Sequence, residues 1–342
     1  MKILVVANMY PTQQNPSSGI FIKKVTEKLS NEAEFDVHLW KLCEGNKYLA
    51  YLHFYFLFIF KLIVVRPDLV YCHFISHTGA LGWLAKKLFG SKLVLNAHGS
   101  DIMNSIKKQE RFFKLNQYLL SHADLVITPS QFLKNIILSH FSVEGSRLFV
   151  SPSGGVAISE QEKTKSKEKS TRLKLGFVGR LIPMKGIDTI ISALKSSEGI
   201  ELKVAGGGEY SSIYNELKTN VELIYYGEIP QSELDSLYND IDLLLFPTKF
   251  EESLGLTPLE AMAHSVPVVA CDMGAVSEYV HHGKTGYLIA KDNASQLNKC
   301  IEHFRSMPTA EKVAMGKQAY QTAKKYEEVS VHQALKSRLS AL

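Results

Sequence analysis

The feature that most constrains the fold of this chain is the alternation of short, β-branched apolar runs with longer amphipathic stretches. Continuous apolar runs are typical of strands buried on both faces, and such strands form parallel sheets that helices cover on each side. Ten runs fit this pattern: ILVVA (3–7), DLVYCHF (68–74), KLVLNAH (92–98), DLVITPS (124–130), RLFVSPS (147–153), LKLGFVG (173–179), ELKVAGG (201–207), VELIYYG (221–227), DLLLFP (242–247) and PVVACD (267–272). The sequence therefore predicts an α/β protein with doubly wound parallel sheets, in which ligands bind beyond the carboxyl ends of the strands.

Two domains are predicted, because 342 residues exceed what a single hydrophobic core commonly supports. Residues 157–172 contain one isoleucine among mostly Lys, Glu, Ser and Thr, which is typical of a linker or an exposed loop. We expect one Rossmann-like domain over 1–156, a second over 173–325, and a helix over 326–342 that packs back on the first domain.

Charge is unevenly shared between the two halves. Residues 1–155 hold 17 Lys and Arg against 10 Asp and Glu, whereas residues 156–342 hold 22 against 24. The basic half favours an anionic partner, such as an anionic membrane surface or a phosphorylated acceptor. Nucleic acid is not expected, because no basic segment is interleaved with aromatic residues. Lysines that only keep the domain soluble would explain the balance equally well.

Cysteine usage and the N-terminus both favour the cytoplasm. Four scattered cysteines form no CxxC pair and no metal-ligand pair with histidine, which is typical of a reducing compartment. The N-terminal MKILVVANMYP has no small-residue cleavage site after its apolar run, so it is predicted to be the first strand and not a signal peptide.

One segment, YLAYLHFYFLFIFKLIVV (48–65), raises the question of a membrane. It is crowded with Tyr and Phe and is interrupted by His53 and Lys61, whereas a spanning helix needs about 20 predominantly apolar residues. We favour a buried helix packed on the sheet, with insertion into a membrane interface as the alternative.

Two cations follow the first strand of the second half. In GRLIPMKG, Arg180 and Lys185 lie between this strand and a helix, where free amides, the helix dipole and a bidentate guanidinium suit a diphosphate. The next strand ends in VAGGGEY, whose glycines, Gly207 among them, allow close approach of a backbone to a ligand. Solvated loop cations and an ordinary glycine turn are the alternative interpretation.

The stretch FEESLGLTPLEAMA (250–263) holds two carboxylates eight positions apart. We expect Glu252 in a loop that faces the crevice and Glu260 in the first turn of a helix that Pro258 helps to begin. A carboxylate in this setting can accept hydrogen bonds from neighbouring hydroxyls of a ribose or a hexose. A solvated loop acid and a helix acid that stabilises the dipole are the alternatives. Four backbone amides can point at an anion there, those of Leu254, Gly255, Leu256 and Thr257.

The combination of GRLIPMKG, AGGGE and ESLGLTPLEAMAHSVPVVA, followed by GKTGYLI (283–289), resembles the C-terminal half of the family 4 retaining glycosyltransferases. Leu254 stands where that family usually has Phe. The resemblance implies the GT-B fold, two Rossmann-like domains facing a central cleft. It also implies that Arg180 and Lys185 hold the diphosphate of a nucleotide sugar, Glu260 its ribose and Glu252 the hydroxyls of the donor sugar.

The first half is similar to the same family in the expected order. PSSGIFIKKVTEKL (16–29) resembles the family's N-terminal glycine loop, with Gly19 as the residue that approaches the donor or acceptor. AHGSD (97–101) resembles the family's His-Gly segment, which makes His98 the candidate facing the donor sugar and Asp101 an acceptor-side candidate. VSPSGGV (150–156) departs from the family's usual Pro-Asn-Gly-Val at the domain crossover.

No catalytic metal and no cofactor are expected. Asp240-Ile241-Asp242 has the Asp-x-Asp spacing by which other glycosyltransferases bind a divalent cation, but it precedes the strand DLLLFP and would lie at the wrong edge of the sheet. Arg180, Lys185 and helix amides would neutralise the leaving diphosphate instead.

These expectations combine into one hypothesis, a metal-independent retaining glycosyltransferase. It would transfer a hexose from a nucleotide diphosphate sugar to a glycan or lipid-linked acceptor, in cell-surface polysaccharide or glycolipid synthesis, from the cytoplasm or peripherally on the cytoplasmic face of the membrane. The alternatives are a nucleotide-sugar epimerase on the same scaffold and a non-catalytic nucleotide-sugar-binding protein. A hydrolase using Glu252 and Glu260 fits less well, because such carboxylates flank the scissile bond at a fixed separation.

Overall fold

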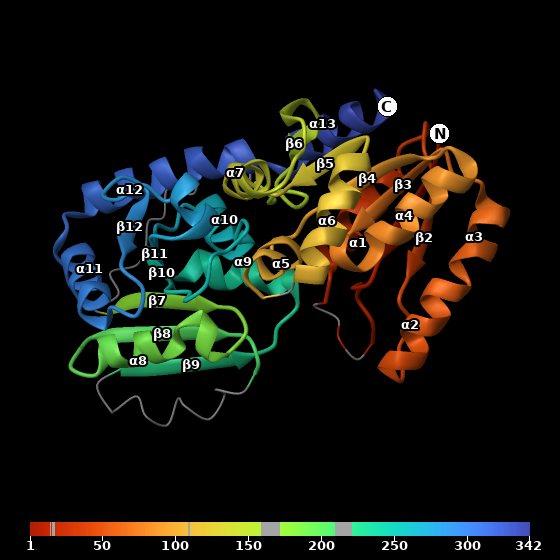
Figure 1. Ribbon diagram of the computed structural model, residues 1–342. Helices are drawn as coiled ribbons and strands as arrows, with labels where there is room; N and C mark the ends of the chain where they lie inside the picture. The colour runs from red at the N-terminus through yellow and green to blue at the C-terminus, as the bar shows by residue number, and fades with distance from the viewer. Residues whose placement is uncertain (14, 16–17, 109, 159–171, 209–220) are drawn as a thin grey trace. The chain divides into compact units, whose positions relative to one another are not determined.

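The computed structural model describes residues 1–342 except 14, 16–17, 109, 159–171 and 209–220. The chain divides into two compact units, the first made of Met1–Gly155 with Val329–Leu342 and the second of Val156–Glu328. Figure 1 colours the chain from red at the N-terminus to blue at the C-terminus, so the last helix can be followed back to the first unit. Most of the predicted linker, 159–171, lies outside the described residues.

The first unit contains a six-stranded parallel sheet in the order β2-β1-β3-β4-β5-β6. Five of these strands lie in the apolar runs predicted from the sequence, and β2 was not predicted. This strand is half-exposed along its length, because it is an edge strand and therefore lacks the continuous apolar run of the central ones. The strands are β1 (Lys2–Ala7), β2 (Asp36–Lys41), β3 (Leu69–His73), β4 (Lys92–Asn96), β5 (Leu125–Thr128) and β6 (Leu148–Val150).

Alternation along β1 sends side chains into a core on each side of this sheet. Leu4 and Val6 belong to one buried cluster, and Ile3 and Val5 belong to another, as the two-residue period of a strand requires. The helices of the unit are α1 (Ile20–Ser30), α2 (Lys47–Phe56), α3 (Phe58–Val65), α4 (Ile75–Phe89), α5 (Ser100–Lys108), α6 (Glu110–His122), α7 (Gln131–His140) and α13 (Glu328–Ser340).

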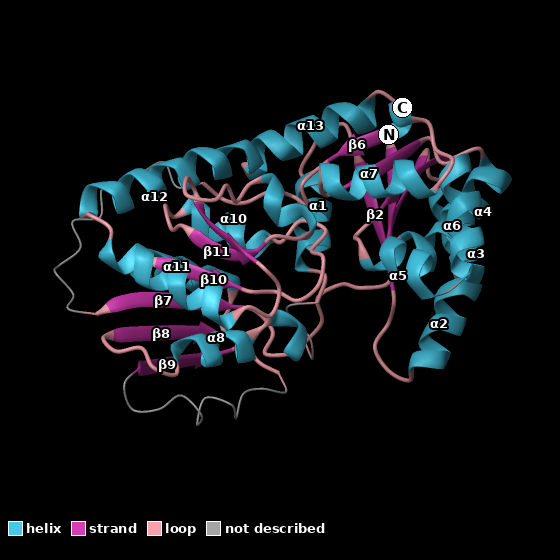
Figure 2. Ribbon diagram, turned by 60° about the vertical axis from the view of Figure 1, so that its left-hand side comes forward, coloured by secondary structure: helices cyan, strands magenta, loops and turns pink. Residues whose placement is uncertain are grey.

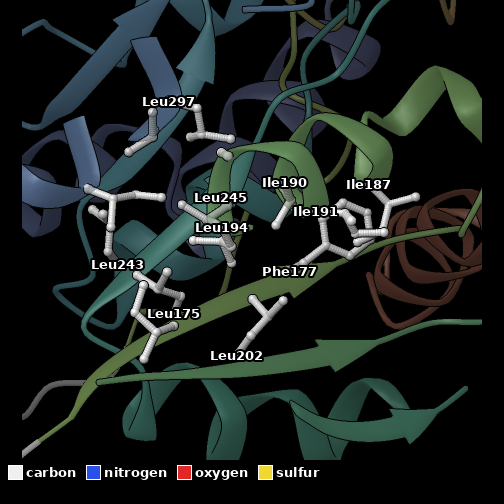
Figure 3. Close-up of a cluster of buried hydrophobic side chains, with 14 of the residues drawn as sticks. Leu175, Phe177, Ile187, Ile190, Ile191, Leu194, Leu202, Leu243, Leu245 and Leu297 are labelled. Carbon is white, nitrogen blue, oxygen red and sulfur yellow. The ribbon is translucent and has the colours of Figure 1, made fainter. Parts of the chain in front are cut away.

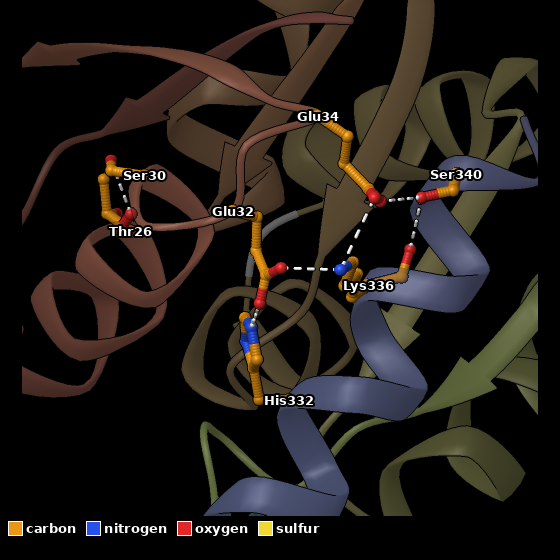
Figure 4. Close-up of polar contacts among 7 residues, drawn as sticks. All are labelled: Thr26, Ser30, Glu32, Glu34, His332, Lys336 and Ser340. Atoms are coloured by element: carbon orange, nitrogen blue, oxygen red, sulfur yellow. Dashed lines mark hydrogen bonds and ion pairs between the residues drawn. The ribbon is translucent and has the colours of Figure 1, made fainter.

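Helix α13 joins the first unit through both apolar and polar contacts. Leu335 and Leu339 are buried in the same cluster as Ile3 and Val5. Glu32 pairs with Lys336 at 2.6 Å and with the Nε2 of His332 at 2.7 Å, and Figure 4 shows these contacts. The hydrogen bond from Lys336 lowers the pKa of Glu32. The end of the chain is thus part of the first unit.

The segment 48–65 forms two consecutive helices, α2 and α3, where one buried helix was expected. Phe54, Phe58 and Leu62 are at most 1% exposed and pack in the core cluster that also holds Leu4 and Val6. No described residue covers the opposite face of the two helices, where Leu52 is 67% exposed and Phe56 is 65% exposed. The expectation of a helix packed on the sheet is therefore right for one face and wrong for the other.

The second unit has a six-stranded parallel sheet in the order β12-β11-β10-β7-β8-β9, which Figures 1 and 2 show in two orientations. The edge strand β12 was not predicted as a strand; its run, GYLI, begins with a glycine. The strands are β7 (Leu173–Val178), β8 (Ile200–Ala205), β9 (Val221–Gly227), β10 (Leu243–Phe246), β11 (Val268–Cys271) and β12 (Gly286–Ile289). The helices are α8 (Ile187–Leu194), α9 (Gln231–Asp240), α10 (Leu256–Ala263), α11 (Ala294–Ser306) and α12 (Thr309–Ala323).

Helix α8 covers the middle of this sheet. Ile187, Ile190 and Leu194 are at most 1% exposed and pack against side chains of the central strands, as Figure 3 shows. Burial of each such side chain contributes about 1.5–3 kcal/mol relative to exposure. This packing fixes the N-terminal end of α8, and hence the loop that precedes it, against the sheet.

Candidate functional site

The predicted site of the second unit lies where the order of its strands reverses. Strand β7 is the first strand of this unit in the sequence but lies in the middle of the sheet, between β8 and β10. In open parallel sheets a ligand crevice forms at this position, beyond the carboxyl ends of the strands. The loops after β7 (179–186) and β10 (247–255) meet there, because the amide of Lys249 donates to the carbonyl of Met184 at 2.8 Å.

A glycine makes this meeting of the two loops possible. Gly186 has φ +76°, and a Cβ atom at its position would lie 2.0 Å from the carbonyl oxygen of Pro247. Only a residue without a side chain allows such an approach, and the left-handed conformation also favours glycine. The same residue precedes α8 as its N-cap. Gly186 therefore sets both the start of the helix and its distance from the second loop.

The structure brings Lys185 and Glu252 together across these two loops. The Nζ of Lys185 lies 2.6 Å from Oε1 of Glu252, with the two side chains 17% and 13% exposed. The ammonium group also lies 4.9 Å from the ring centroid of Phe250 and 5.3 Å from that of Phe246. Aromatic faces attract a cation, more strongly where water is partly excluded. A single half-buried positive charge is thus held beside a carboxylate at the switch point.

Arg180 lies on the same loop as Lys185 but is exposed. Among the described residues its guanidinium has no salt-bridge partner. The structure therefore places the two predicted cations on one loop and pairs only Lys185 with a glutamate.

The loop after β10 is tied down by Tyr279, which the sequence did not indicate. Its hydroxyl lies 2.7 Å from the carbonyl oxygen of Leu254 and 2.9 Å from that of Gly255, and its single proton is shared between them. Burial raises the pKa of Tyr279 well above its usual value, with a further contribution from Glu252, so the phenol stays a donor. Leu254 is buried, and α10 begins at Leu256 with Gly255 as an N-cap that makes no side-chain cap bond. The first amides of α10 consequently have no side-chain cap from that position.

A second glycine brings another segment to this loop. Gly274, after β11, has φ +65°, and a Cβ atom there would lie 2.6 Å from the carbonyl oxygen of Glu252. The amide of Ala275 donates to that same carbonyl at 2.9 Å. These two contacts fix the backbone of Glu252, so its side chain extends from a defined position. The signal available in the sequence was the glycine that follows the end of a strand in CDMGA.

Glu260 lies in the second turn of α10, and the expectation that it lies in the first turn is wrong. The helix starts at Leu256, one residue earlier than TPLEAMA suggested, and its first turn holds no acid. The Oε1 of Glu260 accepts from Nε2 of Gln231 at 2.8 Å, and its Oε2 accepts from the hydroxyl of Tyr238 at 2.9 Å. Burial and the carboxylate of Glu260 raise the pKa of Tyr238 well above its usual value. These two donors on α9 fix the orientation of the carboxylate.

The glycines after β8 serve the packing of loops. The carbonyl of Gly207 accepts from the amide of Leu181 at 2.8 Å. A Cβ atom on Gly207 would lie 2.4 Å from the side chain of Glu228, and one on Gly206 would lie 2.0 Å from the carbonyl of Gly179. Gly207 thus holds the loop that carries Arg180 and Lys185 against the sheet. Residues 209–220, which follow, lie outside the described residues.

In the first unit, Gly19 and His98 lie after β1 and β4. Gly19 is the N-cap of α1 with φ +68°, and a Cβ atom there would lie 2.7 Å from the carbonyl of Met9. The ring of His98 packs 4.9 Å from the centroid of Phe21, which is on α1, and 4.4 Å from that of Phe74. Phe21, two residues after Gly19, thus contacts His98 directly. The start of α1 therefore holds both the close backbone approach at Gly19 and the ring that packs on His98.

A second histidine, His73, was missed by the sequence analysis. It ends β3, which neighbours β4, and its Nδ1 lies 3.1 Å from Nε2 of His98. Burial lowers the pKa of His98 to about 3 and holds that of His73 well below its usual value, where His98 adds to the effect. Both rings are therefore neutral near pH 7, and one must donate to the other. The signal was its position, since the runs ending in YCH and LNAH place both histidines at one edge of the sheet.

Asp101 is buried, and its carboxylate holds backbone in place. Its Oδ2 accepts from the amide of Ile75, the first residue of α4, at 2.7 Å, and its Oδ1 accepts from the amide of His98 at 3.0 Å. Burial raises the pKa of Asp101 to about 6, although these hydrogen bonds act in the opposite direction. This arrangement fixes the segment that carries His98.

The Asp-x-Asp segment is occupied by contacts of its own. Asp240 pairs with Lys174 at 2.7 Å and also pairs with Lys203. A carboxylate oxygen of Asp242 accepts from the amide of Lys174 at 2.9 Å. Both acids precede β10, at the amino end of the sheet. Across the described part of the chain, no group of three or more His, Cys, Asp and Glu residues is arranged to hold a metal ion.

Two units, each a parallel six-stranded sheet between helices and each with polar residues at the strand reversal, have the architecture of GT-B glycosyltransferases. Anabaena HepE, solved in complex with UDP-glucose, shares this fold with a TM-score of 0.77 at 18% identity, over 100% of both chains.

Comparison with protein families gives the same class. A model described as Glycosyl transferases group 1 matches residues 158–322, and one described as Glycosyltransferase Family 4 matches residues 19–154. An uncharacterized glycosyltransferase of Methanocaldococcus jannaschii is 29% identical over 243 residues, 68% of this chain and 64% of that protein. The D-inositol 3-phosphate glycosyltransferase of Corynebacterium glutamicum is 27% identical over 256 residues, 66% of this chain and 60% of that protein. The matches thus span less than two thirds of these relatives' lengths. The chain belongs to glycosyltransferase family 4.

Proposed function

We propose that this protein transfers a hexose from a nucleotide diphosphate sugar to an acceptor hydroxyl with retention of the anomeric configuration. The observation that carries the proposal is the half-buried pair of Lys185 and Glu252 at the strand reversal of the second unit. A fixed cation beside uncapped helix amides suits a diphosphate, and a fixed carboxylate beside it suits sugar hydroxyls. The GT-B fold shared with a protein solved with UDP-glucose supports this choice of donor.

Each predicted residue then has a defined role. Lys185 and Arg180 neutralise the diphosphate, and the amides of Leu254, Gly255 and Leu256 add donors to it. Glu252 accepts from hydroxyls of the donor sugar, and the side chain of Glu260, held by α9, accepts from the ribose. Gly207 and Gly19 allow close backbone approach, the latter to donor or acceptor. His98 contacts the donor sugar, and Asp101 acts on the acceptor side by fixing the segment of His98.

The chemistry needs no strong general base from the protein. The bond between the anomeric carbon and the diphosphate oxygen breaks, and the acceptor oxygen forms a bond to that carbon on the same face. The departing phosphate oxygen takes the acceptor proton. Lys185 and Arg180 stabilise the negative charge that develops on this oxygen, which is the largest change in charge during the step.

We propose that the reaction needs no metal ion and that the acceptor is a glycan or a lipid-linked sugar of cell-surface polysaccharide or glycolipid synthesis. The first unit carries 19 Lys and Arg against 10 Asp and Glu, which supports an anionic acceptor and a cytoplasmic location where acidic lipid is near.

The test is nucleoside diphosphate release by the purified protein, with NMR to read the configuration of the product. A thermal-shift panel of UDP-, GDP- and ADP-sugars identifies the donor, because a ligand that binds only the folded form raises the melting temperature. Lys185→Met and Glu252→Gln should each raise the donor KM or abolish turnover, and a chelator should leave turnover unchanged. Wild-type rates in both variants would reject the assigned roles. Epimerised donor without acceptor would favour an epimerase, and no nucleotide binding by calorimetry would favour a non-catalytic protein.

A further inference from the structure

Helices α2 and α3 carry an exposed apolar stripe. Its members lie three or four residues apart, so they share one face of the helical segment. They are Leu49, Leu52, Phe56, Phe60 and Ile63, with exposed fractions of 65%, 67%, 65%, 58% and 51%. We call these five residues the outer stripe. Scattered exposed apolar residues are ordinary on a protein surface, but a continuous row marks an interaction site.

The opposite face of the same segment is buried, so the helices cannot leave the first unit without loss of its core. Phe54, Phe58 and Leu62 pack in the cluster described above, and the indole Nε1 of Trp40 donates to the carbonyl of Phe54 at 3.1 Å. Tyr55 also bonds the carbonyl of His77 on α4 at 2.6 Å. By length and composition, Tyr48–Val65 could cross a membrane, with a mean hydropathy of 1.9. In the folded unit it lies on the surface instead.

Charge around the outer stripe is positive. Residues 44–100 contain six Lys and Arg, which are Lys47, Lys61, Arg66, Lys86, Lys87 and Lys92, and two acids, Glu44 and Asp68. Lys86 is paired with Asp124 at 2.7 Å, and the balance that remains is positive. Arg66 ends α3 and is exposed. The hydroxyl of Ser91, just after α4, donates to the carbonyl of Pro67 at 2.7 Å, so the ends of α3 and α4 lie together. In Figures 1 and 2 both helices lie on the outside of their unit.

The end of α4 extends the apolar surface beside these cations. Leu88 is 57% exposed and Phe89 is 39% exposed, and Lys87 precedes them with its ammonium 5.9 Å from the ring centroid of Trp83. Apolar side chains next to Lys and Arg are the pattern of helices that lie in a membrane interface. Anionic headgroups attract the cations while the acyl boundary accepts the apolar side chains.

We propose that the outer stripe is a docking surface for an anionic phospholipid bilayer, on which α2 and α3 lie in the plane of the interface. A second copy of this chain is a poorer occupant, because two units with 19 cations against 10 acids each would bring like charge together. The inference goes beyond sugar transfer and applies equally to a protein that proves to have no activity.

Vesicle flotation with the purified full chain tests the proposal. The protein should float with vesicles of phosphatidylglycerol and phosphatidylcholine and remain largely unbound with phosphatidylcholine alone, and added salt should weaken the binding. Leu52→Glu and Phe56→Glu should each lower the partition coefficient at least about tenfold, because a charge replaces a side chain that enters the interface. Both residues are exposed, so thermal unfolding should stay near that of the wild type.

Leu138→Glu is the matched control, because Leu138 is a 42% exposed leucine on α7 of the same unit and lies outside the outer stripe. It should bind vesicles as the wild type does. The proposal is overturned if the wild type does not float with anionic vesicles, or if Phe56→Glu and Leu138→Glu bind equally well. It is also overturned if Phe56→Glu converts a dimer into a monomer in sedimentation without changing vesicle binding, since a second copy would then occupy the stripe.

Discussion

Replacement of Gly186 by alanine tests whether the close approach of two loops builds the candidate site. The added Cβ atom would lie 2.0 Å from the carbonyl oxygen of Pro247, and the backbone has φ +76°. The left-handed conformation alone costs about 1–2 kcal/mol for a residue with a side chain. Displacement of packed backbone adds about 1–3 kcal/mol. We therefore expect Gly186→Ala to lower the free energy of unfolding of the second unit by about 2–5 kcal/mol.

Gly199 supplies the matched control within the same unit. Its φ is +63°, but nothing lies within 4 Å of the position that a Cβ atom would take. Gly199→Ala should therefore incur only the conformational part of the cost, about 1–2 kcal/mol. The difference between the two variants isolates the loop contact.

Calorimetric thermal unfolding of both variants measures this difference. For a unit of this size, 1 kcal/mol corresponds to roughly 2–4 °C in melting temperature, so the contact cost of about 1–3 kcal/mol should make Gly186→Ala melt about 2–12 °C below Gly199→Ala. The displaced loop carries Lys185, so stabilisation by the donor identified in the thermal-shift panel should also be lost in Gly186→Ala alone. Equal melting temperatures for the two variants would refute the reasoning.

Three further predictions concern polar contacts and the last helix. Tyr279→Phe removes the donor to Leu254 and Gly255 and should lower the free energy of unfolding by about 1–3 kcal/mol, and unchanged denaturant midpoints would contradict it. His73→Phe should make acid destabilisation shallower. The pKa of His98 is near 3 in the fold and near 6.5 in the unfolded chain, so its contribution to the free energy of unfolding is present above about pH 6.5 and falls by about 2 kcal/mol by pH 5. The pKa of His73 is lowered in the same direction, so the variant lacks the part of this pH dependence that His73 contributes. Parallel urea melts of wild type and variant at pH 7 and 5 measure the loss of stability in each, and an identical loss would refute a buried neutral pair. Leu339→Ala, on α13, should cost about 2–5 kcal/mol and unfold the first unit preferentially, which hydrogen exchange of β1 can report.

The sequence predicted the elements that are buried on both sides and the residues at their carboxyl ends. Ten strands could be located because central parallel strands are continuously apolar, and Lys185 and Glu252 were expected in one crevice because their strands end at the same edge of a sheet. Of the four edge strands, β6 and β9 were predicted from their apolar runs. The other two, β2 and β12, were not, because polar residues interrupt DVHLWK and GYLI begins with a glycine.

Other features depend on packing that composition does not encode. The turn in which Glu260 lies depends on whether α10 starts at Leu256 or Thr257, and Gly255 decides this through its φ of +80°. The partners of Glu260 come from α9, whose register on the sheet no local pattern reveals. The apolar segment 48–65 was also predicted to be a buried helix, because the hydropathy of a segment does not show which of its faces other elements will cover.

The place of α13 bears on how this protein is made. Leu335 and Leu339 complete a core whose other members include Ile3 and Val5 from the first strand. A nascent chain emerges from the ribosome N-terminus first, and domains generally fold in that order. Here the first unit is completed only once residues 329–342 have emerged, after everything the second unit needs, so the order of completion is inverted.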